Sequence, residues 1–197
     1  MAGDKILKTL FGSDKSEYTS KPLAHFHSFY LSGTIEKPDE YVEIFELIRG
    51  ASKHDVIKIH INSYGGDLFT AIQFMRVLGE TEAQTVASVE GACMSAATMI
   101  FLSCSGFEIS ENSMFMFHNY SGGSIGKGGE MFDQLVHERK WSEKLLRNVY
   151  QDFLTEKEIV SLLDNKDLWM DGDEVVKRLK SEKMKKSKKR VDKSEEA

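Results

Sequence analysis

A serine, a histidine and a pair of glycines occupy positions where this chain could carry out nucleophilic chemistry. Ser95 lies in GACMSAAT, where an expected strand passes into an expected helix among small residues. Such a junction presents the hydroxyl, and the start of a helix supplies free backbone N–H groups and a positive potential. His118 closes the apolar segment MFMFH, and Gly65 and Gly66 follow a strand, where N–H groups can point outward without an obstructing Cβ.

Each of these features taken alone has a commoner structural explanation. A serine in a small-residue helix usually packs, a histidine at a strand end is usually only hydrogen-bonded, and a glycine pair usually marks a turn. Residue types alone therefore do not select Ser95 from the other serines.

The elements that would position these residues begin with strand patterns. FHSFYLSGTI predicts a strand that ends in a glycine turn, and EYVEIFELIR has apolar residues at helical spacing. VIKIHIN alternates isoleucines with Lys58 and His60, which is typical of a strand with one polar face. NSYGG is expected to be a turn. Residues 67–78 predict an amphipathic helix with Leu68, Ile72, Met75 and Leu78 inward and Gly79 just past its end.

The second half of the chain continues the alternation. Residues 84–91 predict a strand, 94–103 a buried helix, and 107–110 and 114–119 short strands. A glycine-rich segment, SGGSIGKGG, precedes one long helix from about Glu130 to Leu154. Thr155 with Glu158, and Asp171 with Glu174, have the spacing of helix starts. This order predicts an α/β fold with largely parallel strand pairing.

Length and composition set the class of protein. The chain has 197 residues, 41% of them hydrophobic, which suffices for one compact domain. Its two cysteines exclude a disulfide scaffold, and no CxxC motif or cysteine–histidine cluster suggests a metal site, so we expect none. The opening MAGDKILKTLFG lacks the apolar core of a signal peptide, and no apolar run is long enough to span a bilayer. We therefore expect a cytoplasmic protein that does not enter a membrane.

Charge is divided unevenly along the chain. The net charge is −5, from 26 basic and 31 acidic residues, but residues 177–197 hold 10 basic and 4 acidic ones. We expect a mobile N-terminal arm over 1–24, a folded domain over 25–180 and a basic, disordered tail over 181–197. The tail has no aromatic residue to stack on bases, which favours a solvated terminus over nucleic-acid binding.

Three sequence blocks in a fixed order resemble one enzyme family. HINSYGG, GACMSAAT and SMFMFHNYSGG are similar to the blocks INSPGG, GxAASMxA and MIHQPxGG of the Clp protease proteolytic subunit. The spacing from Gly66 to Ser95 to His118 is close to that of the family, and the similarity runs from about Phe29 to Val176. The resemblance implies a spiral of repeated β-β-α units with a protruding handle helix, which the long helix would form.

The resemblance also implies a set of site residues. Ser95 aligns with the nucleophile, His118 with the general base and Asp167, in DLWMDGDE, with the aspartate of a Ser-His-Asp triad; Asp164 and Asp171 are nearby competitors. The backbone N–H groups of Gly66 and Ala96 align with the oxyanion hole. The residues implied to bind the substrate as an extended strand are Gly65, Ser121, Gly122, Gly123, Ser124 and Ile125. A neutral serine is a poor nucleophile, so the histidine must take its proton and the aspartate must hold the correct tautomer.

The expected activity is therefore that of a serine endopeptidase, the proteolytic subunit of a self-compartmentalised protease that cleaves unfolded or extended polypeptides. The family assembles as two stacked seven-membered rings, so the resemblance implies a homo-oligomer. It implies no intrinsic cofactor, and ATP would be used only by a partner unfoldase. The family docks this unfoldase in apolar clefts. Here the aligned positions carry Lys58, His60, Glu80 and Glu108, which puts the usual contact in question.

Further departures and alternatives remain open. Tyr64 replaces the proline of the first block, Asn119 and Tyr120 replace the Gln-Pro after the histidine, and Cys93 and Met94 replace two alanines. The closing strand of the family is expected to be absent or replaced by a helix. The chain could also be a catalytically silent ring subunit, a peptidase specialised for one precursor such as a viral head protein, or an acyl-CoA enzyme of the related crotonase superfamily.

Overall fold

A six-stranded sheet forms the centre of the computed structural model, which describes residues 23–123 and 125–181. Residues 1–22 of the predicted arm, Ser124, and residues 182–197 of the predicted tail lie outside the described residues. The strands follow the order β1 (Phe26–Ile35), β2 (Val56–Gly66), β3 (Gln84–Met94), β5 (Met114–Phe117) and β6 (Leu168–Asp171). A further strand, β4 (Gly106–Ile109), pairs with the first half of β3. Every pair is parallel except β5 with β6, which confirms the prediction of largely parallel pairing.

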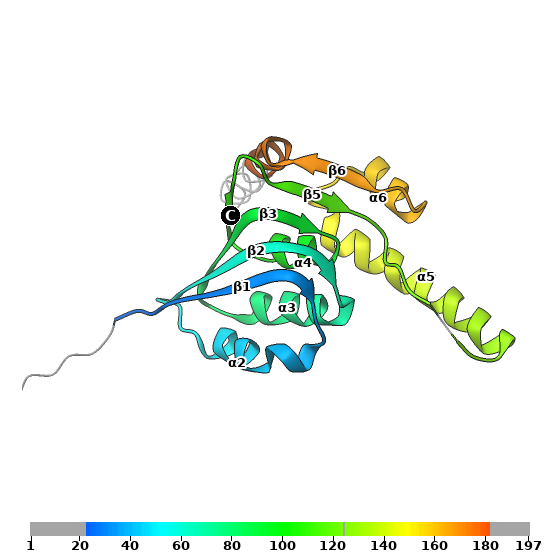
Figure 1. Cartoon of the computed structure of the whole chain (residues 1–197), viewed down its shortest axis with the longest axis horizontal. Helices are drawn as coiled ribbons and strands as arrows, with labels where there is room; N and C mark the ends of the chain where they lie inside the picture. Colours follow the sequence, from blue (N-terminus) through cyan, green and yellow to red (C-terminus); the bar gives the residue numbers. More distant parts are fainter. Residues whose placement is uncertain (1–22, 124, 182–197) are drawn as a thin grey trace, which may run out of the picture.

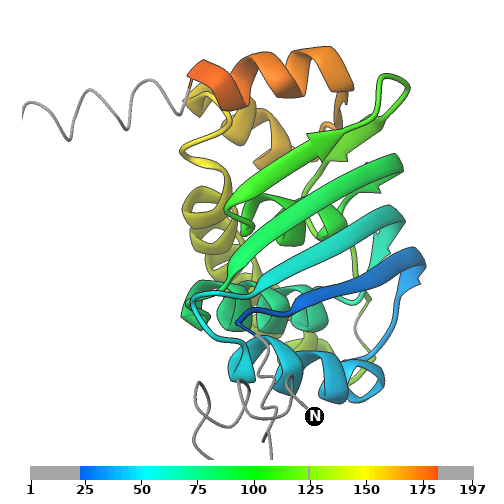
Figure 2. The ribbon, with the colours of Figure 1, turned by 90° about the vertical axis from the view of Figure 1, so that its left-hand side faces the viewer.

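Three helices lie against one face of this sheet, as Figure 1 shows. They are α2 (Val42–Gly50), α3 (Leu68–Glu80) and α4 (Ala96–Leu102), and each connects one parallel strand to the next. The inward side chains of β2, Ile57, Ile59 and Ile61, are fully buried beneath them. The opposite face of β1–β3 is open (Figure 2), and alternate side chains of β2 point toward it. A short 3-10 turn, η1 (Pro38–Tyr41), precedes α2.

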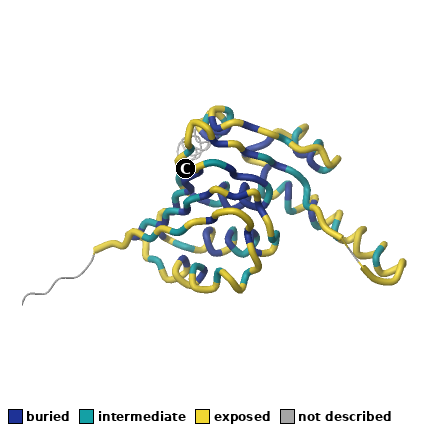
Figure 3. The backbone as a smooth tube through the Cα atoms, in the orientation of Figure 1, coloured by how far each residue is buried: buried dark blue, intermediate teal, exposed yellow. Residues whose placement is uncertain are grey.

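The long helix α5 (Gly128–Tyr150) projects from the body of the molecule. Its buried residues are Ser142, Leu146 and Tyr150, all near its C-terminal end, whereas its N-terminal half is exposed (Figure 3). The helix α6 (Glu156–Leu163) follows, and its Thr155–Glu158 capping box forms as predicted. Residues 172–181 are helical after β6. The prediction that the closing strand of the family is absent or replaced by a helix stays a prediction, because residues 182–197 lie outside the described residues.

Two local predictions were wrong. NSYGG is not a turn: β2 continues through it to Gly66, with one register shift against β1, where Tyr64 is left without a partner, and another against β3. Gly79 lies inside α3, which ends at Glu80, and the most deeply buried face of that helix is centred on Ala71, Phe74 and Val77. Among the described residues, no helix combines the length and the apolar character that crossing a bilayer requires.

Candidate active site

Ser95 occupies a sharp turn between β3 and α4. Its backbone has φ 54° and ψ −128°, a conformation that residues with a Cβ rarely adopt. The turn is held from several sides: the Ser95 N–H donates to the Met116 carbonyl at 2.8 Å, and the Ser95 carbonyl accepts from Thr98 N–H at 2.9 Å. The Thr98 hydroxyl donates to the same carbonyl at 2.7 Å. These bonds fix the serine at the C-terminal edge of the sheet.

Gly65 provides the space that this turn needs. A Cβ added at Gly65 would lie 2.6 Å from the Cβ of Ser95 and 2.8 Å from the Met94 carbonyl oxygen, and its φ is +95°. Any side chain there would displace the serine. Gly65 is therefore required by close packing of the end of β2 against the turn, whereas a Cβ at Gly66 would instead clash with the Ile35 carbonyl oxygen of β1.

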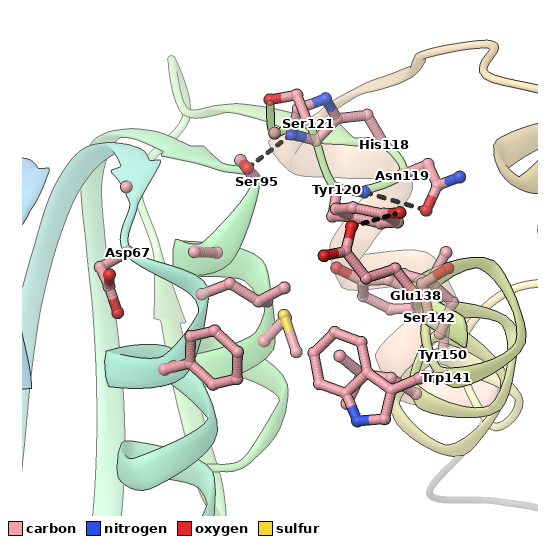
Figure 4. A pocket seen from close by; sticks show the side chains of 18 of the residues that line it. Asp67, Ser95, His118, Asn119, Tyr120, Ser121, Glu138, Trp141, Ser142 and Tyr150 are labelled. Carbon is pink, nitrogen blue, oxygen red and sulfur yellow. Dashed lines mark hydrogen bonds between the residues drawn. The ribbon is translucent and has the colours of Figure 1, made fainter. Parts of the chain in front are cut away.

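His118 meets Ser95 because their strands are parallel neighbours. β5 ends at Phe117, and its Met116 pairs with Met94 at the end of β3, so both side chains leave the same edge of the sheet. The distance from Ser95 Oγ to His118 Nε2 is 2.5 Å, a hydrogen bond drawn in Figure 4. This contact lets the imidazole accept the hydroxyl proton.

Three aspartates are candidates for the third position, and all three lie within or just before β6 in the sequence. Phe117 pairs with Leu168 in antiparallel register, so the next pair along would be His118 with Asp167. Asp167 is exposed, and no hydrogen bond or ion pair joins it to His118 in the part of the chain that the structure describes. Asp171 instead accepts the Glu174 N–H at 2.9 Å, and Asp164 is the residue that follows the end of α6.

A cavity of about 580 Å³ opens beside the Ser95 hydroxyl. The start of α3 and the C-terminal half of α5 form its walls. The apolar side chains that line it are Leu68, Phe69, Met99, Trp141, Leu145 and Leu146. Phe69 stacks on Trp141 with ring centroids 5.8 Å apart, which joins the two walls. The arrangement can hold an apolar side chain next to the Ser95 hydroxyl.

A family comparison agrees with this geometry. The family model described as Clp protease matches residues 30–178. The chain belongs to the Clp protease family. No curated protein matches the chain in sequence. Membership confirms the resemblance and the α/β fold class, and it identifies the chain as a peptidase.

Most of the site residues predicted from the sequence of this Clp protease lie around the cavity. Gly66 and Ala96 both line it, and Ala96 is the first residue of α4, so its N–H has no acceptor within the helix. Ser121, Gly122 and Gly123 line the side next to His118. Gly65 packs behind Ser95, and Ile125 is fully exposed outside the cavity.

Several cavity residues of the Clp protease were not expected from its sequence. Tyr120, one of the departures from the family pattern, donates its hydroxyl to Glu138 at 3.2 Å, and desolvation and this carboxylate raise the pKa of Tyr120. Glu138, Trp141 and Leu145 recur at helical spacing along α5, a pattern that could have indicated one shared face. Asp67 also lines the cavity, but its carboxylate accepts the Thr70 N–H and caps α3.

Tyr150 lies at the floor of the cavity, 1% exposed. Its hydroxyl is 2.7 Å from the hydroxyl of Thr98, and burial raises the pKa of Tyr150. Since Thr98 gives its one proton to the Ser95 carbonyl, Tyr150 must donate to Thr98. The chain of hydrogen bonds from α5 through α4 thus ends on the backbone of the serine.

Proposed function

We propose that this Clp-family peptidase is a serine endopeptidase that cleaves extended polypeptides with Ser95 as nucleophile. The observation that carries the proposal is the 2.5 Å hydrogen bond between Ser95 Oγ and His118 Nε2 at a strained strand-to-helix turn. Strained backbone of this kind costs about 1–3 kcal/mol and persists where the surrounding structure enforces it, often at active sites.

The proposed reaction begins with proton transfer from Ser95 Oγ to His118 Nε2 as the oxygen bonds to the peptide carbonyl carbon. The N–H groups of Gly66 and Ala96 would stabilise the resulting oxyanion, each by roughly 3 kcal/mol. His118 then gives the proton to the leaving amine as the C–N bond breaks. Water, deprotonated by the same imidazole, releases the acyl group and restores the serine.

The cavity supports a preference for an apolar or aromatic side chain before the cleaved bond. Trp141, Phe69 and Leu146 would surround this side chain, while the substrate backbone would pair with residues 121–123. Backbone pairing depends little on the side chains of the substrate, so the peptide need only be extended.

Asp167 is the third member of the triad that we propose, although no hydrogen bond joins it to His118 among the described residues. The strand register supports an approach of Asp167 to His118, and catalytic hydrogen bonds often tighten only when substrate binds. A permanent separation of the two residues would instead suit a catalytically silent ring subunit.

Labelling with a fluorophosphonate probe, followed by peptide mapping, separates these functions. We expect an adduct on Ser95 that Ser95→Ala abolishes and that Ser28→Ala, an exposed site on β1, leaves intact. Folded, assembled protein without an adduct on Ser95 would contradict the serine-peptidase proposal and favour the silent subunit.

A further inference from the structure

Two histidines and an aspartate gather at the end of the sheet opposite Ser95. His25 and His27 stand at the start of β1, and Asp55 immediately precedes β2. The Val56 N–H donates to the His25 carbonyl at 2.9 Å, which brings the beginnings of these parallel strands together. In Figure 1 both strands begin on the left, whereas α5, which contributes a wall of the cavity, lies on the right. The cluster is therefore separate from the proposed catalytic residues.

The three side chains converge with a spacing that suits metal coordination. One donor atom from each, a ring nitrogen or a carboxylate oxygen, lies within 4.8 Å of the other two. His25 Nδ1 is 3.3 Å from Asp55 Oδ1. Two ligands on a tetrahedral ion with bonds of about 2.0–2.1 Å would be about 3.3 Å apart. His27 follows His25 by two residues, so both rings leave the same face of the strand, and they stack at 5.7 Å.

Asp55 is a buried anion that lacks a strong cationic partner. It is 5% exposed, and its two oxygens accept the N–H groups of His25 at 2.6 Å and Ser52 at 2.7 Å. Among the described residues, neither a lysine nor an arginine forms an ion pair with it; its one ion-pair partner is His25. Buried charges are normally paired or bound to a metal, so a cation is favoured here.

We propose that His25, His27 and Asp55 bind one zinc-class transition-metal ion, with solvent as the fourth ligand. Two imidazoles and a carboxylate suit zinc and its neighbours, whereas calcium and magnesium prefer oxygen ligands. A shallow cavity of about 460 Å³ beside the end of α2 leaves room for the solvent ligand. The ion would clamp the starts of β1 and β2. This proposal is independent of the serine-peptidase proposal and departs from the expectation of no metal, which considered only cysteine-containing motifs.

Zinc chloride titrated calorimetrically into the metal-stripped full chain tests the site. We expect one high-affinity site per chain and a rise in the unfolding midpoint when zinc is present. Loss of even an outer-shell partner weakens metal binding by about 10- to 100-fold, so His25→Ala and His27→Ala should each weaken it by at least about tenfold. Both side chains are near the surface, so we expect each variant to fold. Circular dichroism checks the fold of each variant before the titration.

Two control variants locate the binding. His54→Ala removes an exposed histidine next to Asp55 that is outside the cluster, and His118→Ala removes the active-site imidazole. Both should bind zinc as the unaltered chain does. The proposal is overturned if the unaltered chain binds no zinc in the micromolar range, if His25→Ala and His27→Ala retain full affinity, or if either control variant abolishes binding.

Discussion

At the scale of single residues, the conformation of Ser95 depends on a hydrogen-bond chain that starts in another helix. Tyr150 donates to Thr98, and Thr98 donates to the Ser95 carbonyl, both at 2.7 Å. Neither the Thr98 hydroxyl nor the Tyr150 hydroxyl is hydrogen-bonded to Ser95 Oγ, so the role of both is to position the turn. Thr98 is fully buried, and deleting its hydroxyl would leave the Tyr150 hydroxyl without its acceptor.

We predict that Thr98→Val lowers kcat more than it changes KM and lowers the free energy of unfolding by about 1–3 kcal/mol. Thr98→Ser keeps the hydroxyl and should restore most of kcat. Tyr150→Phe should have a smaller effect, because Thr98 keeps its bond to Ser95. Peptide-hydrolysis kinetics and urea unfolding measure both effects, with the exposed Tyr30→Phe as control. Equal losses in Thr98→Val and Thr98→Ser would contradict a positioning role of the hydroxyl.

At the scale of elements, a charged clamp joins α6 to the helix over residues 172–181. Arg178 donates to both oxygens of Glu158, at 2.8 and 2.9 Å, and the same carboxylate accepts the Thr155 N–H in the capping box. The Arg178 hydrogen bonds are the largest cause that lowers the pKa of Glu158, to about 2. Because two helices share this carboxylate, its ionisation contributes to stability.

The depressed pKa sets the direction of the pH dependence. Glu158 ionises near pH 4.5 in the unfolded chain, so its contribution is present above that pH and is lost as the pH falls toward 2. The contribution is roughly 2–3 kcal/mol.

Glu158→Gln should therefore lower the free energy of unfolding at pH 7 and reduce the further loss between pH 5 and 3, as measured by urea unfolding. Glu156→Gln breaks only an exposed pair with Arg147 and should cost less than about 1 kcal/mol. If Glu158→Gln lost as much stability between pH 5 and 3 as the unaltered chain does, this assignment would be contradicted.

The same elements show what the sequence can and cannot predict. The strand–helix order, the Thr155 capping box and the Ser95–His118 approach follow from local patterns and family blocks, because each depends on a few neighbouring residues. The extension of β2 through NSYGG depends on register shifts against two other strands. Trp141 and Tyr150 line the cavity through contacts with Phe69 of α3 and Thr98 of α4, and the spacing along α5 can indicate a shared face but not which helices that face contacts.

At the scale of the whole molecule, the open face of the sheet differs from an apolar docking surface. Lys58 Nζ lies 2.6 Å from Glu108 Oε2 and lowers the pKa of that carboxyl, so the pair stays charged. His60 Nδ1 lies 2.5 Å from Glu90 Oε1, and Tyr30 stacks on the His60 ring at 4.5 Å. Glu80, at the end of α3, pairs with Arg76. Each polar residue expected at the docking positions thus has a charged or polar partner: Lys58 and Glu108 pair with each other, His60 with Glu90, and Glu80 with Arg76.

An aliphatic anchor from an unfoldase loop would have to cover these pairs and remove their hydration. Desolvating an ion pair costs free energy that its Coulomb attraction often fails to return, so such an anchor should bind weakly here.

We predict that co-sedimentation with a Clp-type unfoldase and ATP shows no stable complex. Replacing both members of the exposed pair, as Lys58→Leu with Glu108→Leu, should increase binding because no charge is then left unpaired. The single change Lys58→Leu is the matched control: it leaves Glu108 without its cation and should not increase binding. If the unaltered chain binds the unfoldase with ordinary affinity, the unfoldase uses this face despite its charges, and the prediction is wrong. If only the double variant gains binding, the Lys58–Glu108 pair opposes an apolar anchor.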